Sequence, residues 1–195
     1  FHHGLHTLLF PFFGPSLLKR DHRFRLVVMP GLIHTLFKSD RWLSFYREEG
    51  IRVRAYGNLN LLDRHFKELN LGDEITLAEK LTSGHDRHRL FYGFFSSPAF
   101  DRAFIREITA SVEFRVYDPQ LSELAYLYYG EPMNAADFFI TSTRPGYLGA
   151  LPPFAYDQKT RLFTLAAPGV SALKDSTYRE ILYDLLFLGP GPNGQ

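Results

Sequence analysis

The sequence predicts an α/β fold in which a mostly parallel β-sheet is flanked by helices. Five short apolar runs are bounded by glycine, proline or polar residues, which is typical of buried strands. Helical patterns lie between these runs, and strands that alternate with helices form parallel sheets with helices on both faces. The 195 residues suit one domain. We therefore expect a single domain over residues 1–188 and a flexible tail over residues 189–195 (GPGPNGQ).

The expected strands share high apolar content and nearby turn residues. They cover residues 5–13, 51–56, 89–95, 136–141 and 161–166. The first strand (LHTLLFPFF) lies between Gly4 and Gly14, and the second (IRVRAY) alternates apolar and basic residues. These features make both segments strands rather than helices, because neither is long enough or periodic enough for a helix.

The expected helices show amphipathic spacing or a recognisable start or stop. They cover residues 17–37, 41–49, 61–69, 73–83, 98–110, 122–129 and 175–188. Gly50 and Gly130 each follow a helical segment, where glycine favours termination. Pro98 stands at the start of another helix, where its missing N–H costs little.

The composition excludes several classes of protein. Hydrophobic residues make up 45% and charged residues 22%, which fits a globular protein. The net charge of +1 gives no field that would attract nucleic acid. The absence of cysteine excludes disulfides, thiolate metal sites and a cysteine nucleophile, and it fits a reducing compartment. No apolar stretch is long enough to span a membrane, and Phe1–Gly4 does not resemble a signal peptide. We expect a cytoplasmic protein with at most peripheral membrane contact.

Common catalytic motifs are missing from the sequence. It contains no G-x-S-x-G nucleophile turn, no P-loop and no G-x-G-x-x-G after the first strand. Histidines gather at residues 2–6 and at 85–88, but without a complete ligand pattern we favour solvated loop histidines over a metal site. Arg52 and Arg54 alternate along one strand, and either a solvated or a phosphate-pairing role fits them.

The segment at residues 137–147 (DFFITSTRPGY) is the strongest candidate for a binding site. Its strand ends in Thr141, Ser142 and Thr143, followed by Arg144. Ligands of open α/β sheets bind beyond the carboxyl ends of the strands, and hydroxyls with a guanidinium can hold a phosphate or diphosphate. An ordinary surface turn with one arginine is an equally good interpretation of this motif alone.

A second cationic group follows the first strand, at Lys19 and Arg20. If both loops lie at the same edge of the sheet, Arg20 and Arg144 converge there. Aromatic residues make up 16% of the chain, with 19 Phe and 11 Tyr. They supply apolar surface for a core, an apolar ligand or a partner.

The order and spacing of five segments resemble a known family. The segments are residues 43–59 (LSFYREEGIRVRAYGNL), 88–95 (HRLFYGFF), 128–144 (YYGEPMNAADFFITSTR), 159–168 (KTRLFTLAAP) and 178–188 (YREILYDLLFL). They are similar to the cis-prenyltransferase superfamily, the undecaprenyl diphosphate synthase-like enzymes. The branch they resemble most is typified by the tuberculosinol and tuberculosinyl-adenosine synthases.

This resemblance implies an apolar tunnel for an isoprenoid tail, with Mg²⁺ and the diphosphate of an allylic prenyl diphosphate at its mouth. Aromatic faces could then line the tail pocket and stabilise a carbocation, although most phenylalanines are expected to be core. Arg20, Arg144 and the hydroxyls of residues 141–143 would bind the diphosphate. Phe13 and Tyr147 would border the reacting centre. The resemblance also implies a homodimer.

Three departures from the family pattern concern the second substrate. Where the chain-elongating enzymes carry F-S-x-E-N-W-x-R, Phe13 and Arg20 keep the aromatic residue and the arginine, but the serine and asparagine are lost. Residues 141–150 lack both arginines of R-x-S-G-x-x-R-x-S-N at their usual places, and Arg161 stands where the family has a metal-binding glutamate. We therefore expect no ordinary elongation with isopentenyl diphosphate.

The family begins with a strand, an Asp-Gly-x-x-x-Arg loop and a helix that have no counterpart here. The catalytic aspartate is thus expected upstream of Phe1. The missing strand would lie between the strands at residues 5–13 and 51–56, unless another segment replaces it.

Three functional hypotheses follow. The leading one is a terpene synthase or a prenyltransferase that acts on an allylic prenyl diphosphate, with a small-molecule acceptor in the second case. The alternative is a non-catalytic subunit with a regulatory or dimer-forming role. A weaker third is an unrelated α/β ligand-binding domain.

Overall fold

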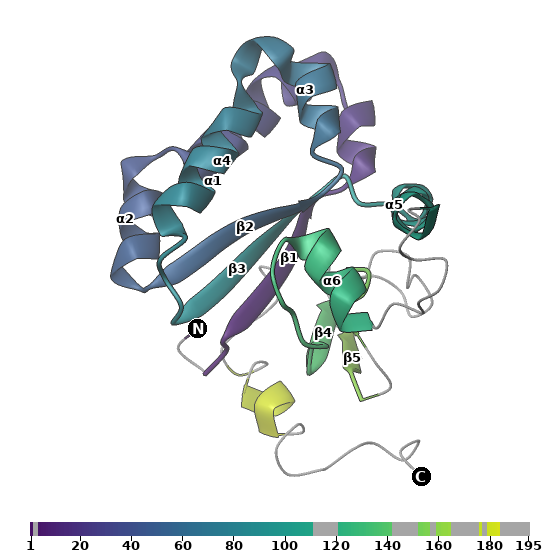
Figure 1. The fold of residues 1–195 in the computed structure, drawn as a ribbon. Coiled ribbons are helices and arrows are strands. Elements are labelled where there is room, and N and C mark those ends of the chain that lie inside the picture. Colours follow the sequence, from purple (N-terminus) through teal and green to yellow (C-terminus); the bar gives the residue numbers. More distant parts are fainter. Residues whose placement is uncertain are drawn as a thin grey trace. The chain divides into compact units, whose positions relative to one another are not determined.

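A computed structural model describes residues 1, 4–110, 121–141, 152–156, 159–164, 176 and 179–183. The chain forms two compact units, Phe1–Pro132 and Met133–Gln195, and each has a sheet of its own. The first unit contains a three-stranded sheet and most of the helices (Figure 1).

All five expected strands are present. They are β1 (Thr7–Phe13), β2 (Ile51–Gly57), β3 (His88–Phe94), β4 (Phe138–Thr141) and β5 (Arg161–Thr164). In the first unit all pairing is parallel, in the order β1-β3-β2. In the second unit β4 and β5 pair in parallel, with Phe138 opposite Arg161. The prediction of an α/β fold with parallel pairing is confirmed.

The strand order corrects one expectation. The family resemblance led us to expect a strand from outside this sequence between β1 and β2. In the structure β3 occupies this position. Both neighbours pair with β3 along its length, so its backbone groups are used on both sides. Among the described residues β1 pairs on one side only, which suits Pro11 because proline cannot donate to a ladder. The register of β1 shifts between Phe10 and Phe13, around this proline.

The edge of β2 that does not pair with β3 is covered by side chains of α4 (Leu71–Thr82). The Val53 N–H donates to Thr82 Oγ1 over 3.1 Å, and the Ala55 N–H donates to Glu79 Oε1 over 2.7 Å. These bonds satisfy two donors that an exposed edge would present to another chain. This edge is therefore closed locally.

The helices of the first unit agree with the predicted segments. The segment at 17–37 divides into η1 (Pro15–Lys19), η2 (Phe24–Val28) and α1 (Met29–Phe37). The others are α2 (Asp40–Glu48), α3 (Asn60–Phe66) with η3 (Lys67–Leu69), α4 (Leu71–Thr82), α5 (Pro98–Ala110) and α6 (Leu121–Tyr129). Beyond α2, Gly50 adopts a φ of 65°, the left-handed conformation expected of a terminating glycine. Of the helix expected over 175–188, the structure describes residue 176 and residues 179–183, which are helical. The tail at 189–195 lies outside the described residues.

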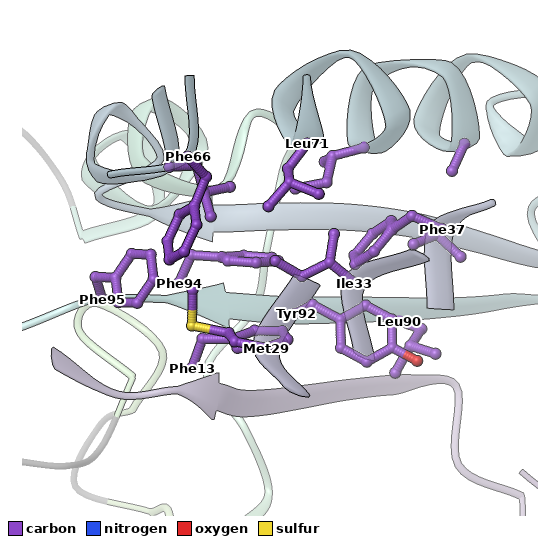
Figure 2. Packing of buried hydrophobic residues seen from close by; sticks show 14 of the residues in the cluster. Phe13, Met29, Ile33, Phe37, Phe66, Leu71, Leu90, Tyr92, Phe94 and Phe95 are labelled. Carbon is purple, nitrogen blue, oxygen red and sulfur yellow. The ribbon is translucent and has the colours of Figure 1, made fainter. Parts of the chain in front are cut away.

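A hydrophobic core lies between one face of the sheet and α1, α3 and α4 (Figure 2). Met29, Ile33 and Phe37 of α1 are almost completely buried there. Phe37 contacts Tyr92 of β3, with 5.2 Å between ring centroids. Since alternate residues of a strand point to opposite faces, Leu90, Tyr92 and Phe94 face this core. Much of the aromatic surplus is thus core packing.

The opposite face of the sheet is covered by α6 (Figure 1). Tyr129 packs against Phe91 of β3 and Tyr56 of β2, with ring centroids 5.8 and 4.9 Å apart. Gly93 makes room for Tyr56, because a Cβ at Gly93 would lie 2.6 Å from the tyrosine Oη. The first unit therefore has helices on both faces of its sheet, as predicted.

Candidate functional site

The three parallel strands of the first unit end at one edge. Phe13 of β1 and Gly57 of β2 both pair with Phe94 of β3 in the register. Because ligands of parallel α/β sheets bind beyond this edge, the residues that follow these strands form the candidate site. They are the segment after β1 that ends at Arg20, and the turn from β3 into α5.

Arg20 lies at the end of η1, directly after β1. Its side chain is exposed, and its guanidinium carbon lies 5.6 Å from the centroid of the Phe24 ring. This contact orients the cation without neutralising it. Arg20 keeps its positive charge, and its role in binding a diphosphate stays a prediction.

Phe13 has a different environment from the one expected of a residue that borders a substrate. Its ring is 1% exposed and stacks on Phe94 at 4.6 Å and 15°. In this structure Phe13 belongs to the core behind the edge. Its role beside a reacting centre stays a prediction.

The remaining predicted diphosphate ligands follow β4 in the second unit. Thr141 is the last residue of β4 and pairs with Thr164. Ser142, Thr143, Arg144 and Tyr147 lie outside the described residues. Their convergence with Arg20 therefore stays a prediction.

A polar cluster that sequence reasoning missed lies at the turn from β3 into α5. The Tyr128 hydroxyl donates to Asp101 Oδ1 over 2.8 Å, and the Ser96 hydroxyl donates to the same oxygen over 3.2 Å. The hydroxyls of Ser96 and Tyr128 lie 2.9 Å apart. The sequence did carry a partial signal in its Ser-Ser-Pro start of α5, where Ser97 Oγ accepts from the Phe100 N–H over 3.2 Å. Nothing in it linked Asp101 with Tyr128, 27 positions away.

Burial controls the protonation of this cluster. Desolvation raises the pKa of the Asp101 carboxyl, against the opposing effect of the hydrogen bonds from Tyr128 and Ser96 and of the charge on Arg102. Desolvation also raises the pKa of the Tyr128 and Tyr56 hydroxyls, and the negative charge of Asp101 adds to both shifts. Both tyrosines are consequently neutral hydrogen-bond donors near neutral pH.

A second polar cluster accounts for the arginines of β2. Arg52 stands directly opposite Arg89 of β3 in the register, an arrangement that repels unless a counter-ion is present. Glu131, which is 5% exposed, supplies it. Arg52 donates to Glu131 Oε2 over 3.1 Å, and nitrogens of Arg54 and Arg89 lie 3.8 and 3.7 Å from the same carboxylate. The arginines of β2 are therefore paired with a buried glutamate rather than simply solvated.

The described residues do not assemble a metal centre. No group of three or more histidines, aspartates or glutamates with suitable geometry occurs among them. At the candidate edge the cluster contributes one carboxylate, Asp101, which already accepts from two hydroxyls. This is too few oxygen ligands for Mg²⁺ held by protein alone. In the described part of the chain, no helix is long and apolar enough to cross a membrane.

The sequence and the structure were compared with known proteins. No family model matches the sequence. A search of curated proteins finds tuberculosinyl adenosine transferase of Mycobacterium tuberculosis, 30% identical over 192 residues. The match covers 96% of this chain and 62% of the relative's length.

Solved structures show the same fold. A probable undecaprenyl diphosphate synthase from Campylobacter jejuni superposes with a TM-score of 0.63, at 17% identity, over 92% of this chain and 80% of the other. Lavandulyl diphosphate synthase from Lavandula x intermedia, in complex with dimethylallyl diphosphate, gives a TM-score of 0.59, at 15% identity, over 93% of this chain and 76% of the other.

The fold defines an α/β protein with parallel strands, an exposed arginine in the segment after β1 and a hydroxyl–carboxylate cluster at the turn after β3. The solved structures give the chain a cis-prenyltransferase fold, and its sequence likeness to tuberculosinyl adenosine transferase supports a relationship to the cis-prenyltransferase-like family. The sequence-based recognition and fold class are confirmed.

Proposed function

We propose that this chain is part of an enzyme that ionises an allylic prenyl diphosphate and delivers the prenyl cation to an acceptor other than isopentenyl diphosphate, or cyclises it. The observation that carries the proposal is the 30% identity to tuberculosinyl adenosine transferase across 96% of the chain. Because the chain spans 62% of that relative, the proposal concerns the full-length protein that contains this sequence.

The departures at the second-substrate positions support an acceptor other than isopentenyl diphosphate. Arg161 begins β5, and its backbone N–H donates to the Asp137 carbonyl over 3.0 Å. The family resemblance places a metal-binding glutamate at this position. A guanidinium cannot coordinate a cation, so a metal-bound second diphosphate loses its ligand here.

The first diphosphate would be held by cationic and hydroxyl side chains. Arg20 is exposed in the segment that follows β1, and Arg144 with the hydroxyls of residues 141–143 are its proposed partners. Charge develops on the diphosphate as the allylic C–O bond breaks, so fixed cations lower the energy of the transition state. Phe13 and Tyr147 remain the proposed neighbours of the reacting carbon.

Several finer features belong to the same proposal. Mg²⁺ would be the cofactor, and it would bring further positive charge to the diphosphate when bound. Its ligands would come from outside the described residues, since these do not form a site for it. We also propose that the full-length protein forms a homodimer and is located in the cytoplasm.

The test uses the full-length protein with Mg²⁺ and geranyl, farnesyl or geranylgeranyl diphosphate, with adenosine or with water alone as acceptor. We expect diphosphate release with at least one of the three substrates and no chain extension when isopentenyl diphosphate is added. Arg20→Ala should weaken binding of the allylic diphosphate about tenfold, since charge-assisted contacts to phosphate oxygens are strong. Arg23→Ala, which removes a neighbouring exposed arginine, is the matched control. The absence of release with every substrate from a folded protein would refute the proposal.

The second candidate function is a non-catalytic subunit, and the arginine at position 161 favours it. An Asp-Gly-x-x-x-Arg loop upstream of Phe1 in the coding sequence would support the enzyme. Binding of prenyl diphosphates without turnover by the full-length protein would support the subunit.

A further inference from the structure

The cluster of Ser96, Asp101 and Tyr128 has no part in the proposed diphosphate chemistry. It connects α6, through Tyr128, with the turn from β3 into α5, within the first unit. Its chemistry is unlike that of a diphosphate site, because its charged member is a carboxylate that would repel a diphosphate. It suits a ligand that donates hydrogen bonds or carries positive charge.

Asp101 retains the capacity to accept a further hydrogen bond. Both short bonds, from Tyr128 at 2.8 Å and from Ser96 at 3.2 Å, end on Oδ1. Oδ2 lies 3.5 Å from the Ser96 hydroxyl, at the limit of a hydrogen bond. A carboxylate has about four lone-pair positions, so Oδ2 can accept from another donor.

Tyr56 supplies a second, independent sign of a ligand. Its side chain is 1% exposed, and its hydroxyl has no hydrogen-bond partner among the described residues. A buried hydroxyl without a partner costs free energy unless another group satisfies it. The Tyr56 ring lies 6.0 Å from that of Tyr128, and its hydroxyl lies against Gly93 of β3, the strand that leads into the turn with Ser96.

Aromatic rings surround the carboxylate. Phe104 and Phe100 of α5 lie 5.1 and 6.3 Å from the Tyr128 ring, between centroids. Tyr129 lies 5.1 Å from Tyr128. Such faces accommodate an apolar chain and attract positive charge. The combination of one carboxylate, several phenol groups and apolar rings fits the acceptor side of a prenyl transfer.

We infer that Asp101, with Tyr128, Ser96 and Tyr56, forms the acceptor subsite, which holds a hydroxyl or amine acceptor and takes its proton. In the step, the allylic C–O bond breaks and its electron pair leaves with the diphosphate. A lone pair on the acceptor oxygen or nitrogen forms the new bond to carbon. The acceptor proton passes to Asp101 Oδ2 and later returns to solvent. This inference rests on the proposed function.

The test compares the full-length wild type with Asp101→Asn, using the allylic diphosphate that the protein accepts and water as the acceptor probe. The measurements are the affinity for the allylic diphosphate and the ratio of prenyl alcohol to hydrocarbon among the products. We expect Asp101→Asn to reduce alcohol formation about 100-fold, the usual size of a general-base contribution. Affinity for the diphosphate should stay unchanged, and the products should shift toward hydrocarbon.

Matched controls separate this effect from a loss of structure. Glu107→Gln removes an exposed carboxylate on the same helix, and Tyr126→Phe removes a hydroxyl that is half exposed on α6. Both should leave the alcohol fraction unchanged, whereas Tyr128→Phe should lower it. If Asp101→Asn retains the wild-type rate and product ratio, or if the wild type forms hydrocarbon alone, the inference is wrong and the proposed function stands. If the wild type consumes no prenyl diphosphate, both are refuted.

Discussion

The Tyr128 hydroxyl donates a hydrogen bond of 2.8 Å to Asp101 Oδ1 and thereby joins α6 to the first turn of α5. Two elements that are separated in sequence are fixed at the edge where the strands end. The bond has a neutral donor, since burial keeps the tyrosine protonated, and an acceptor whose charge is poorly solvated. It therefore contributes to both stability and electrostatics at this edge.

Tyr128→Phe is expected to destabilise the protein by about 1.5–3 kcal/mol. The variant keeps the buried ring but removes a donor to a carboxylate, and hydrogen bonds to charged groups contribute about this much. Chemical denaturation monitored by circular dichroism measures the free energy of unfolding. Tyr126→Phe on the same helix is the control, because Tyr126 is 51% exposed and its loss should change stability by less than about 0.5 kcal/mol. Equal effects of the two variants would contradict a structural role for the bond.

The stability of the first unit should depend on pH through Asp101. Desolvation raises the pKa of this carboxyl in the folded state, so the folded protein binds its proton more tightly than the unfolded chain does. The resulting stabilisation is complete below the unfolded pKa of about 3.9 and is lost as the pH rises through the folded value. Consequently, the free energy of unfolding of wild type relative to Asp101→Asn should fall across this interval. A difference that rises with pH there would contradict the assignment.

Gly93→Ala should be destabilising by about 1–3 kcal/mol, the usual range for overpacking. The added Cβ would lie 2.6 Å from Tyr56 Oη and 3.0 Å from the Pro11 Cα. The backbone of β1 cannot retreat without disturbing its pairing with β3. Gly31→Ala in α1 is the control: its Cβ would meet nothing within 4 Å, and alanine should stabilise the helix by about 0.5–1 kcal/mol. Melting temperatures that shift in opposite directions would confirm the prediction.

The sequence was sufficient for the elements but not for their order. Apolar runs and terminating residues such as Gly50 are local signals, and they located the strands and helices closely. The pairing of β3 with both neighbours depends on non-local contacts that periodicity does not encode. The contacts of the two polar clusters could not be predicted for the same reason, because they join residues that are distant in sequence. Asp101 and Tyr128 are 27 positions apart, and Arg52 and Glu131 are 79 positions apart. The proposed role of Arg20 rests on a local signal, a cation in the segment that follows a strand, and stays a prediction.

Glu131→Gln tests the second of these clusters. Three arginines from two adjacent strands surround this carboxylate, and it is nearly inaccessible to solvent. Removing the charge leaves the directly opposed Arg52 and Arg89 without their shared counter-ion, so we expect a loss of about 3 kcal/mol in the free energy of unfolding. Denaturant titrations at low and high salt measure this loss. Salt should reduce it, because mobile ions screen the remaining repulsion between arginines that are about a quarter exposed.

Glu48→Gln, which removes an exposed carboxylate on α2, is the control and should change stability little at either salt concentration. If Glu131→Gln is as stable as wild type in low salt, the arginines do not depend on this glutamate, and the cluster does not stabilise the amino-terminal half of the sheet.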